Sequence, residues 1–192
     1  MREISNQYGG IYRRYSDDFV LVVPKVNINK SLTMNGFLNL EKEVRELAEV
    51  NEIELQESKT ELLEYENRAV FSLGNYEKTR LDYLGFIFDG ETVKMRGKSP
   101  YKFYREAYKL INQGMKTKFQ KNLHKIPYRK RIYGLYTDLG IKRGTYGNFI
   151  TYAKRAQASF DKMSPYTNNI MMKQIKNRKK KIENKLGFKL HT

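Results

Sequence analysis

The chain of 192 residues contains no cysteine and only two histidines. Without cysteine it can form neither a disulfide scaffold nor a cysteine-ligated zinc or iron–sulfur site. His124 and His191 leave little room for a histidine metal cluster. No run of about 18 apolar residues occurs, so we predict no transmembrane helix. No apolar stretch follows the charged residues at positions 1–6, so we expect no secretory signal. We therefore expect a cytoplasmic protein.

Acidic residues are scarce in the second half of the chain. The sequence has 37 Lys and Arg and 21 Asp and Glu, for a net charge of +16. Residues 1–96 hold 13 of the basic and 17 of the acidic residues, so residues 97–192 hold the remaining 24 and four. Tyrosines and phenylalanines are interleaved with these basic residues and could stack on bases. The pattern favours a nucleic-acid partner over a merely basic, soluble surface.

Hydrophobic patterning predicts an α+β fold, with strands first and helices later. Runs rich in β-branched and aromatic residues predict strands at 11–15, 19–23, 53–55, 62–63, 69–73 and 81–88. Asp89-Gly90 predicts a hairpin turn into a strand at 92–95. Apolar residues at helical spacing predict helices around 35–51, 99–115, 132–139, 145–163 and 171–186. We therefore expect two domains, residues 1–98 and residues 99–192.

Two adjacent carboxylates, Asp17 and Asp18, stand between two apolar runs. Their like charges repel, and burial next to the strands would be costly. A divalent cation relieves both costs, and Mg²⁺ is commonly held by one or two carboxylates together with substrate phosphates. An exposed acidic turn without a metal is the simpler alternative for this feature taken alone.

The segment Tyr15-Ser16-Asp17-Asp18, with the apolar run after it, resembles the Tyr-x-Asp-Asp hairpin of reverse transcriptases. Two later segments resemble further parts of that family, in the family's order. Residues 55–60, LQESKT, resemble its Lys-Thr loop, and residues 81–86, LDYLGF, resemble its primer-grip hairpin. The resemblance covers about residues 8–120, followed by a thumb-like helical region. It is closest in character to bacterial retron, group II intron and abortive-infection defence enzymes.

The resemblance implies an RNA-directed DNA polymerase, with RNA template, DNA primer and deoxynucleoside triphosphates as partners and no membrane. Asp17 and Asp18 would be catalytic and would hold Mg²⁺, or Mn²⁺ in its place. Lys59 would stand near the leaving pyrophosphate as a charge stabiliser or proton donor. The residues that would bind primer or template are Tyr15, Tyr83, Leu84, Gly85 and Lys98. The simpler alternatives are a core tyrosine, surface lysines and a plain strand with a bulge glycine.

One part of the family pattern is missing. The family needs a third carboxylate on an earlier palm strand and a finger region, and only residues 1–8 precede the hairpin. We therefore expect the second half of a palm followed by a basic thumb. The missing part would come from an N-terminal segment or a partner chain. The alternatives are an inactive nucleic-acid-binding module derived from such an enzyme, and a small basic structural protein. A role in phage defence is a further expectation.

Overall fold

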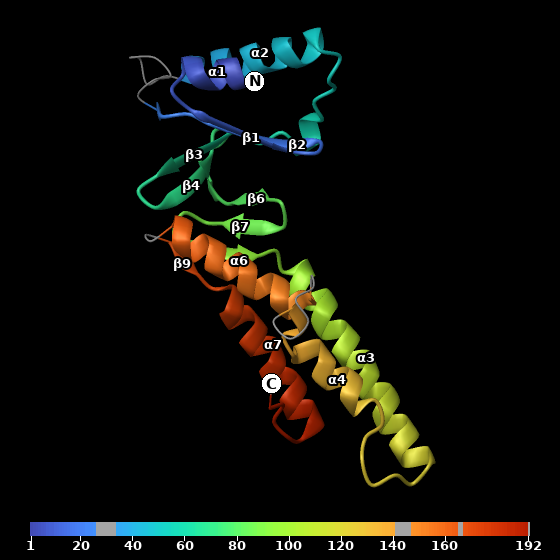
Figure 1. The fold of residues 1–192 in the computed structure, drawn as a ribbon. Coiled ribbons are helices and arrows are strands. Elements are labelled where there is room, and N and C mark those ends of the chain that lie inside the picture. The colour runs from blue at the N-terminus through green and yellow to red at the C-terminus, as the bar shows by residue number, and fades with distance from the viewer. Residues whose placement is uncertain (26–33, 141–146, 165–166, 192) are drawn as a thin grey trace. The chain divides into compact units, whose positions relative to one another are not determined.

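The computed structural model describes residues 1–25, 34–140, 147–164 and 167–191 (Figure 1). It contains helices together with antiparallel and mixed strands, which confirms the predicted α+β class. The chain forms two compact units. The first comprises residues 1–64 and 72–77, and the second comprises residues 65–71 and 78–192. Within the described residues, none of the helices has both the length and the apolar character that crossing a bilayer requires.

The first unit is a β-hairpin packed against helices. Its elements are α1 (Arg2–Gln7), β1 (Ile11–Tyr15), β2 (Asp18–Val22), α2 (Met34–Val50) and the 3-10 helix η2 (Glu57–Lys59). Buried Ile4 and Leu40 form its small core, with Leu21 of β2 packed against them. The Tyr8 hydroxyl donates a hydrogen bond of 2.8 Å to Glu43 of α2, and this bond raises the pKa of Tyr8.

The predicted strand at 53–55 is wrong. This segment pairs with no strand among the described residues. Its first amide, that of Ile53, instead donates to the carbonyl of Ala48 at 2.8 Å and closes the end of α2. Glu52, with φ 55°, supplies the left-handed residue that such a helix end uses. The strand predicted at 62–63 begins at Leu63 and continues to Glu66.

A three-stranded sheet follows, with the strand order β3 (Leu63–Glu66), β4 (Ala69–Ser72) and β5 (Lys78–Thr79). Asn67 and Arg68 both have positive φ, as a two-residue hairpin turn requires. The Glu64 side chain is 4% exposed, and it pairs with Lys25 and accepts a hydrogen bond of 3.2 Å from Tyr76. These two partners compensate the cost of burying the carboxylate.

The second unit contains a four-stranded sheet in the order β6 (Leu81–Tyr83), β7 (Phe86–Phe88), β8 (Thr92–Met95) and β9 (Asn168–Asn169). The single strand predicted over 81–88 is wrong. The chain reverses at Leu84 and Gly85, which places Tyr83 opposite Phe86. Both turn residues have positive φ, which ends one strand and starts the next.

The predicted hairpin into residues 92–95 is confirmed, with Phe88 opposite Val93. Burial would raise the pKa of Asp89. Hydrogen bonds from the Thr92 hydroxyl, the Thr92 amide and the Glu91 amide outweigh it and hold that pKa below its ordinary value. The carboxylate of Asp89 thereby fixes the turn between β7 and β8.

The four helices predicted in the second half are present as α3 (Lys98–Gln120), α4 (Arg129–Tyr136), α6 (Phe149–Met163) and α7 (Met171–Leu186). Their buried faces meet in one core, which includes Ile111, Ile132 and Ile182. Val93 and Met95 of β8 belong to the same core. The second unit therefore joins the β6–β8 sheet to the helices, and the compact units divide the chain earlier than the expected domain boundary at residue 98.

Gly90, in the turn between β7 and β8, has no room for a side chain. Its φ is 102°, and a Cβ there would overlap the backbone carbonyl of Arg68. We predict that Gly90→Ala lowers the free energy of unfolding by about 2 kcal/mol or more. Gly134→Ala in α4 is the matched control. Its Cβ would meet nothing within 4 Å, so it should stabilise by about 0.5–1 kcal/mol. Urea denaturation measures both, and equal effects would contradict the close approach at Gly90.

Candidate functional site

The β1–β2 hairpin presents two of the predicted catalytic residues at its tip. Tyr15 pairs with Asp18, so Ser16 and Asp17 form a two-residue loop. Ser16 has φ 56°, and its carbonyl accepts a bond of 2.7 Å from the Arg14 guanidinium, which holds the loop. Asp17 and Asp18 are exposed, as is Tyr15, whose side chain is 67% exposed. Tyr15 is therefore no core tyrosine.

The two carboxylates supply oxygen donors of the kind that Mg²⁺ prefers. None of the described residues donates a hydrogen bond to Asp17 or Asp18 or forms an ion pair with them. Nor do the described residues include a group of three acidic or histidine side chains able to hold a metal. The tip therefore fits part of a magnesium site and needs a further acidic ligand to resemble a two-metal centre.

Lys59 is the last residue of η2, and it is exposed. The turn is closed by Thr60, whose hydroxyl donates to the Gln56 carbonyl at 3.0 Å. Among the described residues, no hydrogen bond or ion pair joins Lys59 to Asp17 or Asp18. Lys59 is thus available to an anionic ligand, and its role toward a leaving pyrophosphate stays a prediction.

A second turn, in the second unit, carries three of the predicted primer-binding residues. Tyr83 is half-buried and ends β6, while Leu84 and Gly85 form the turn before β7. Leu84 has φ 48° and its side chain is 40% exposed, so a bulky apolar residue occupies a strained position facing solvent. A Cβ on Gly85 would meet nothing within 4 Å, so the backbone there is open to a ligand.

Arg96, the residue that follows β8, supports this turn. The Arg96 amide donates to the Gly85 carbonyl at 2.7 Å, and the Arg96 guanidinium pairs with Asp82 at 2.6 Å. Lys98, two residues later, is exposed and begins α3. The fold therefore brings Tyr83, Leu84 and Gly85 into one turn. Lys98 follows Arg96, the residue that bonds to this turn, by two positions in the chain.

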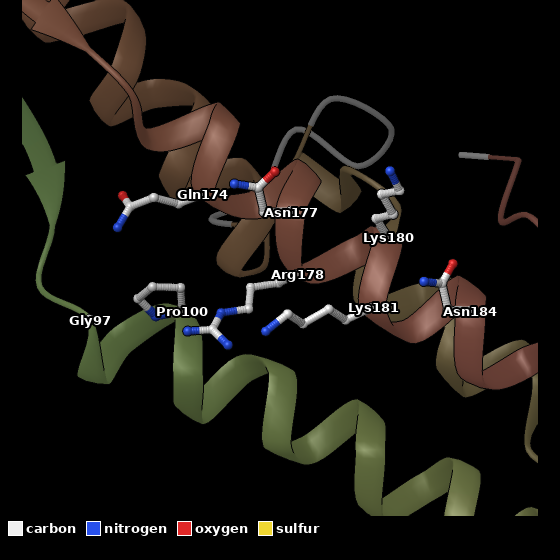
Figure 2. Close-up of a pocket in the computed structure, with 8 residues that line it drawn as sticks. All are labelled: Gly97, Pro100, Gln174, Asn177, Arg178, Lys180, Lys181 and Asn184. Atoms are coloured by element: carbon white, nitrogen blue, oxygen red, sulfur yellow. The ribbon is translucent and has the colours of Figure 1, made fainter.

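A groove of about 480 Å³ lies in the second unit between the start of α3 and α7 (Figure 2). The residues that line it are Gly97, Pro100, Gln174, Asn177, Arg178, Lys180, Lys181 and Asn184. Figure 2 shows Arg178 and Lys181 reaching from α7 toward the first turn of α3. The charge run at 177–181 is visible in the sequence, but the groove requires α3 to pack beside it.

The described residues thus offer an exposed acidic tip, an exposed turn with an open backbone and a basic groove. Taken separately, the acidic tip can bind a metal ion and the basic groove can bind a phosphate, and the described residues include no group of three acidic or histidine side chains that could complete a metal centre. No protein-family model matches this chain, and no curated protein matches it significantly.

The strain at Leu84 is testable. Asparagine adopts the left-handed region more easily than leucine, so Leu84→Asn should raise the free energy of unfolding by about 0.5–1 kcal/mol. Leu123→Asn is the matched control, because Leu123 is 39% exposed and has no positive φ. It should bring no gain. Chemical denaturation compares the two variants, and destabilisation by Leu84→Asn would mean that the leucine side chain contributes packing that outweighs the strain.

Proposed function

We propose that this chain is the C-terminal palm and thumb part of an RNA-directed DNA polymerase, completed by an earlier segment or a partner chain. The observation that carries the proposal is the hairpin tip, where Asp17 and Asp18 are adjacent, exposed and preceded by Tyr15. Two further features support it. A second hairpin with an exposed turn at Leu84 follows in the chain, and the basic helices follow that hairpin.

Each part has a role in the proposed reaction. Asp17 and Asp18 would hold Mg²⁺ together with an acidic residue from the completing segment, and the ion would supply Lewis-acid stabilisation of the phosphates. Lys59 would add positive charge near the departing pyrophosphate. The Leu84-Gly85 turn would position the primer strand, and the basic helices would contact its phosphates.

A second candidate is a nucleic-acid-binding module without catalysis. It is favoured by the lack of a third acidic group beside Asp17 and Asp18 among the described residues. The two candidates share the basic helices and differ in whether nucleotides are added to a primer. Activity measurements therefore distinguish them, and binding measurements do not.

The first prediction concerns catalysis. The 192-residue chain alone should extend no primer with Mg²⁺ or Mn²⁺, because the described residues supply no third acidic ligand beside Asp17 and Asp18. Coexpressed with the reading frame that precedes it in its genome, it should incorporate deoxynucleotides on a primed RNA template. Asp17→Asn should then slow incorporation by about three or more orders of magnitude, since a metal contact contributes several kcal/mol to the transition state.

Glu49→Gln is the control for that measurement. It removes the same charge from an exposed position of α2. It should leave the rate within about twofold, as surface substitutions usually do. If Asp17→Asn slowed incorporation by less than tenfold, Asp17 and Asp18 would be only an acidic turn and not metal ligands. Extension by the pure chain would contradict the view that its site is incomplete, and no extension by the coexpressed pair would favour the binding module.

The second prediction concerns binding by the basic helices. Residues 97–192 hold 24 basic and four acidic residues. If six to ten of the basic residues contact phosphates, affinity for an RNA–DNA hybrid should fall by roughly three to five decades between about 50 and 200 mM salt. Sequence preference should be slight, because phosphate contacts position without specifying. Fluorescence titrations at several salt concentrations measure this, and a flat response or no binding at low salt would remove the nucleic-acid function.

A further inference from the structure

We infer that the groove between α3 and α7 is a binding site for a phosphate of a nucleic-acid backbone. The inference rests on the proposed nucleic-acid binding and assigns it to particular residues. Arg178, Lys180 and Lys181 line the groove, and no acidic residue does among those described. A groove lined by cations and amides has a positive potential that attracts an anion.

The cations of the groove are free to meet a ligand. None of the described residues forms an ion pair with Arg178, Lys180 or Lys181. The neighbouring Lys179 differs, because it lies 4.0 Å from Glu183 on the same helix. Helix α7 thus pairs Lys179 with a carboxylate, whereas Arg178 and Lys181, which Figure 2 shows reaching toward α3, have no carboxylate partner within the described part of the chain.

The start of α3 leaves open space in the same groove. Gly97 is the N-cap residue of this 23-residue helix, lines the groove, and makes no side-chain capping bond. A Cβ at Gly97 would meet nothing within 4 Å, so the space beside the first turn is open. The helix dipole favours an anion at this end. The Ser99 amide donates to the Arg96 carbonyl at 2.9 Å and Pro100 has no amide hydrogen, so the donors of the groove are mainly the side chains of α7.

The walls of the groove are fixed before any ligand arrives. The Gln174 side chain accepts a bond of 2.9 Å from the Met95 amide and donates one of 3.0 Å to the Met95 carbonyl, which ties α7 to β8. The Arg178 guanidinium lies 5.5 Å from the centre of the Tyr104 ring on α3. A charged group held in this way loses little freedom when it binds a phosphate.

The lining also indicates the kind of phosphate. No aromatic side chain among the described residues lines the groove, so it offers no ring on which the base of a free nucleotide could stack. Asn177 and Asn184 are neutral hydrogen-bond donors that suit phosphodiester oxygens. A backbone phosphate of a bound strand fits these features, with its bases directed elsewhere.

The test replaces Gly97 by two residues of the same shape and different charge. Asp and Asn are nearly identical in shape, and a Cβ at Gly97 would meet nothing within 4 Å, so Gly97→Asp and Gly97→Asn should unfold at similar temperatures, which thermal denaturation checks. On an RNA–DNA hybrid at about 100 mM salt, Gly97→Asp should bind roughly tenfold more weakly, because it places a carboxylate in the groove. Gly97→Asn should bind within about twofold of the unmodified chain.

A second pair of variants removes charge. Arg178→Gln with Lys181→Gln should lower the slope of log affinity against log salt by about 0.9 for each phosphate that the variant no longer neutralises. Lys173→Gln with Lys176→Gln removes the same charge from exposed positions of the same helix that do not line the groove. This control should change the slope by less than half as much.

The outcomes separate the inference from the proposed function. Two results would overturn the inference about the groove and leave the proposed function standing, provided that the unmodified chain binds the hybrid. In the first, Gly97→Asp binds as tightly as Gly97→Asn. In the second, the two double variants change the slope equally. If the unmodified chain does not bind, both the inference and the proposed function fail. Sodium triphosphate is the third probe. Tight triphosphate binding that Gly97→Asp abolishes, without effect on the hybrid, would reassign the groove to free polyphosphates and overturn the inference.

Discussion

The apolar core shared by four helices and one strand is the interaction on which the basic half of this protein depends. Ile111, Ile132 and Ile182 are buried within it, and Met95 of the interior strand β8 brings the sheet into contact with the helices. Residues 97–192 hold 24 basic and four acidic residues, so the folded helices repel one another at their surfaces. Burial of this core opposes that repulsion, because hydrophobic burial is the largest favourable contribution to folding.

Aromatic rings supplement the core where carboxylates are scarce. Lys185 lies 3.7 Å from the centre of the Tyr108 ring, and Arg129 lies 4.7 Å from the centre of the Phe188 ring. A ring face attracts a cation without adding a negative charge that would repel a polyanion. The helices are thus stabilised in a way that preserves their positive field. A surface made stable by acidic partners would lose that field.

The hairpin turns are the other constraint shared by both units. Ser16, Leu84 and the Asn67-Arg68 pair all have positive φ, and each reverses the chain within two residues. Two of these turns carry the residues with predicted chemical roles. A residue with a side chain is strained at positive φ, whereas glycine is not. Such backbone strain is often found at functional sites. The acidic tip and the Leu84 turn both present their side chains to solvent.

The sequence by itself determined the α+β class, the approximate positions of the helices and the Asp17-Asp18 hairpin, because these depend on the local spacing of apolar residues and on turn chemistry. The hydrophobic pattern predicted one strand over residues 81–88, because a run of apolar residues has the same pattern whether or not the chain reverses inside it. Only the resemblance of residues 81–86 to a primer-grip hairpin implied a turn there. The sequence could not show that Ile53 closes a helix, because its amide has a partner only once α2 is formed. The groove between Gly97 and Arg178 was decided by tertiary structure alone. Those residues are far apart in the chain, and only the packing of α3 against α7 and the Gln174–Met95 bonds place them together.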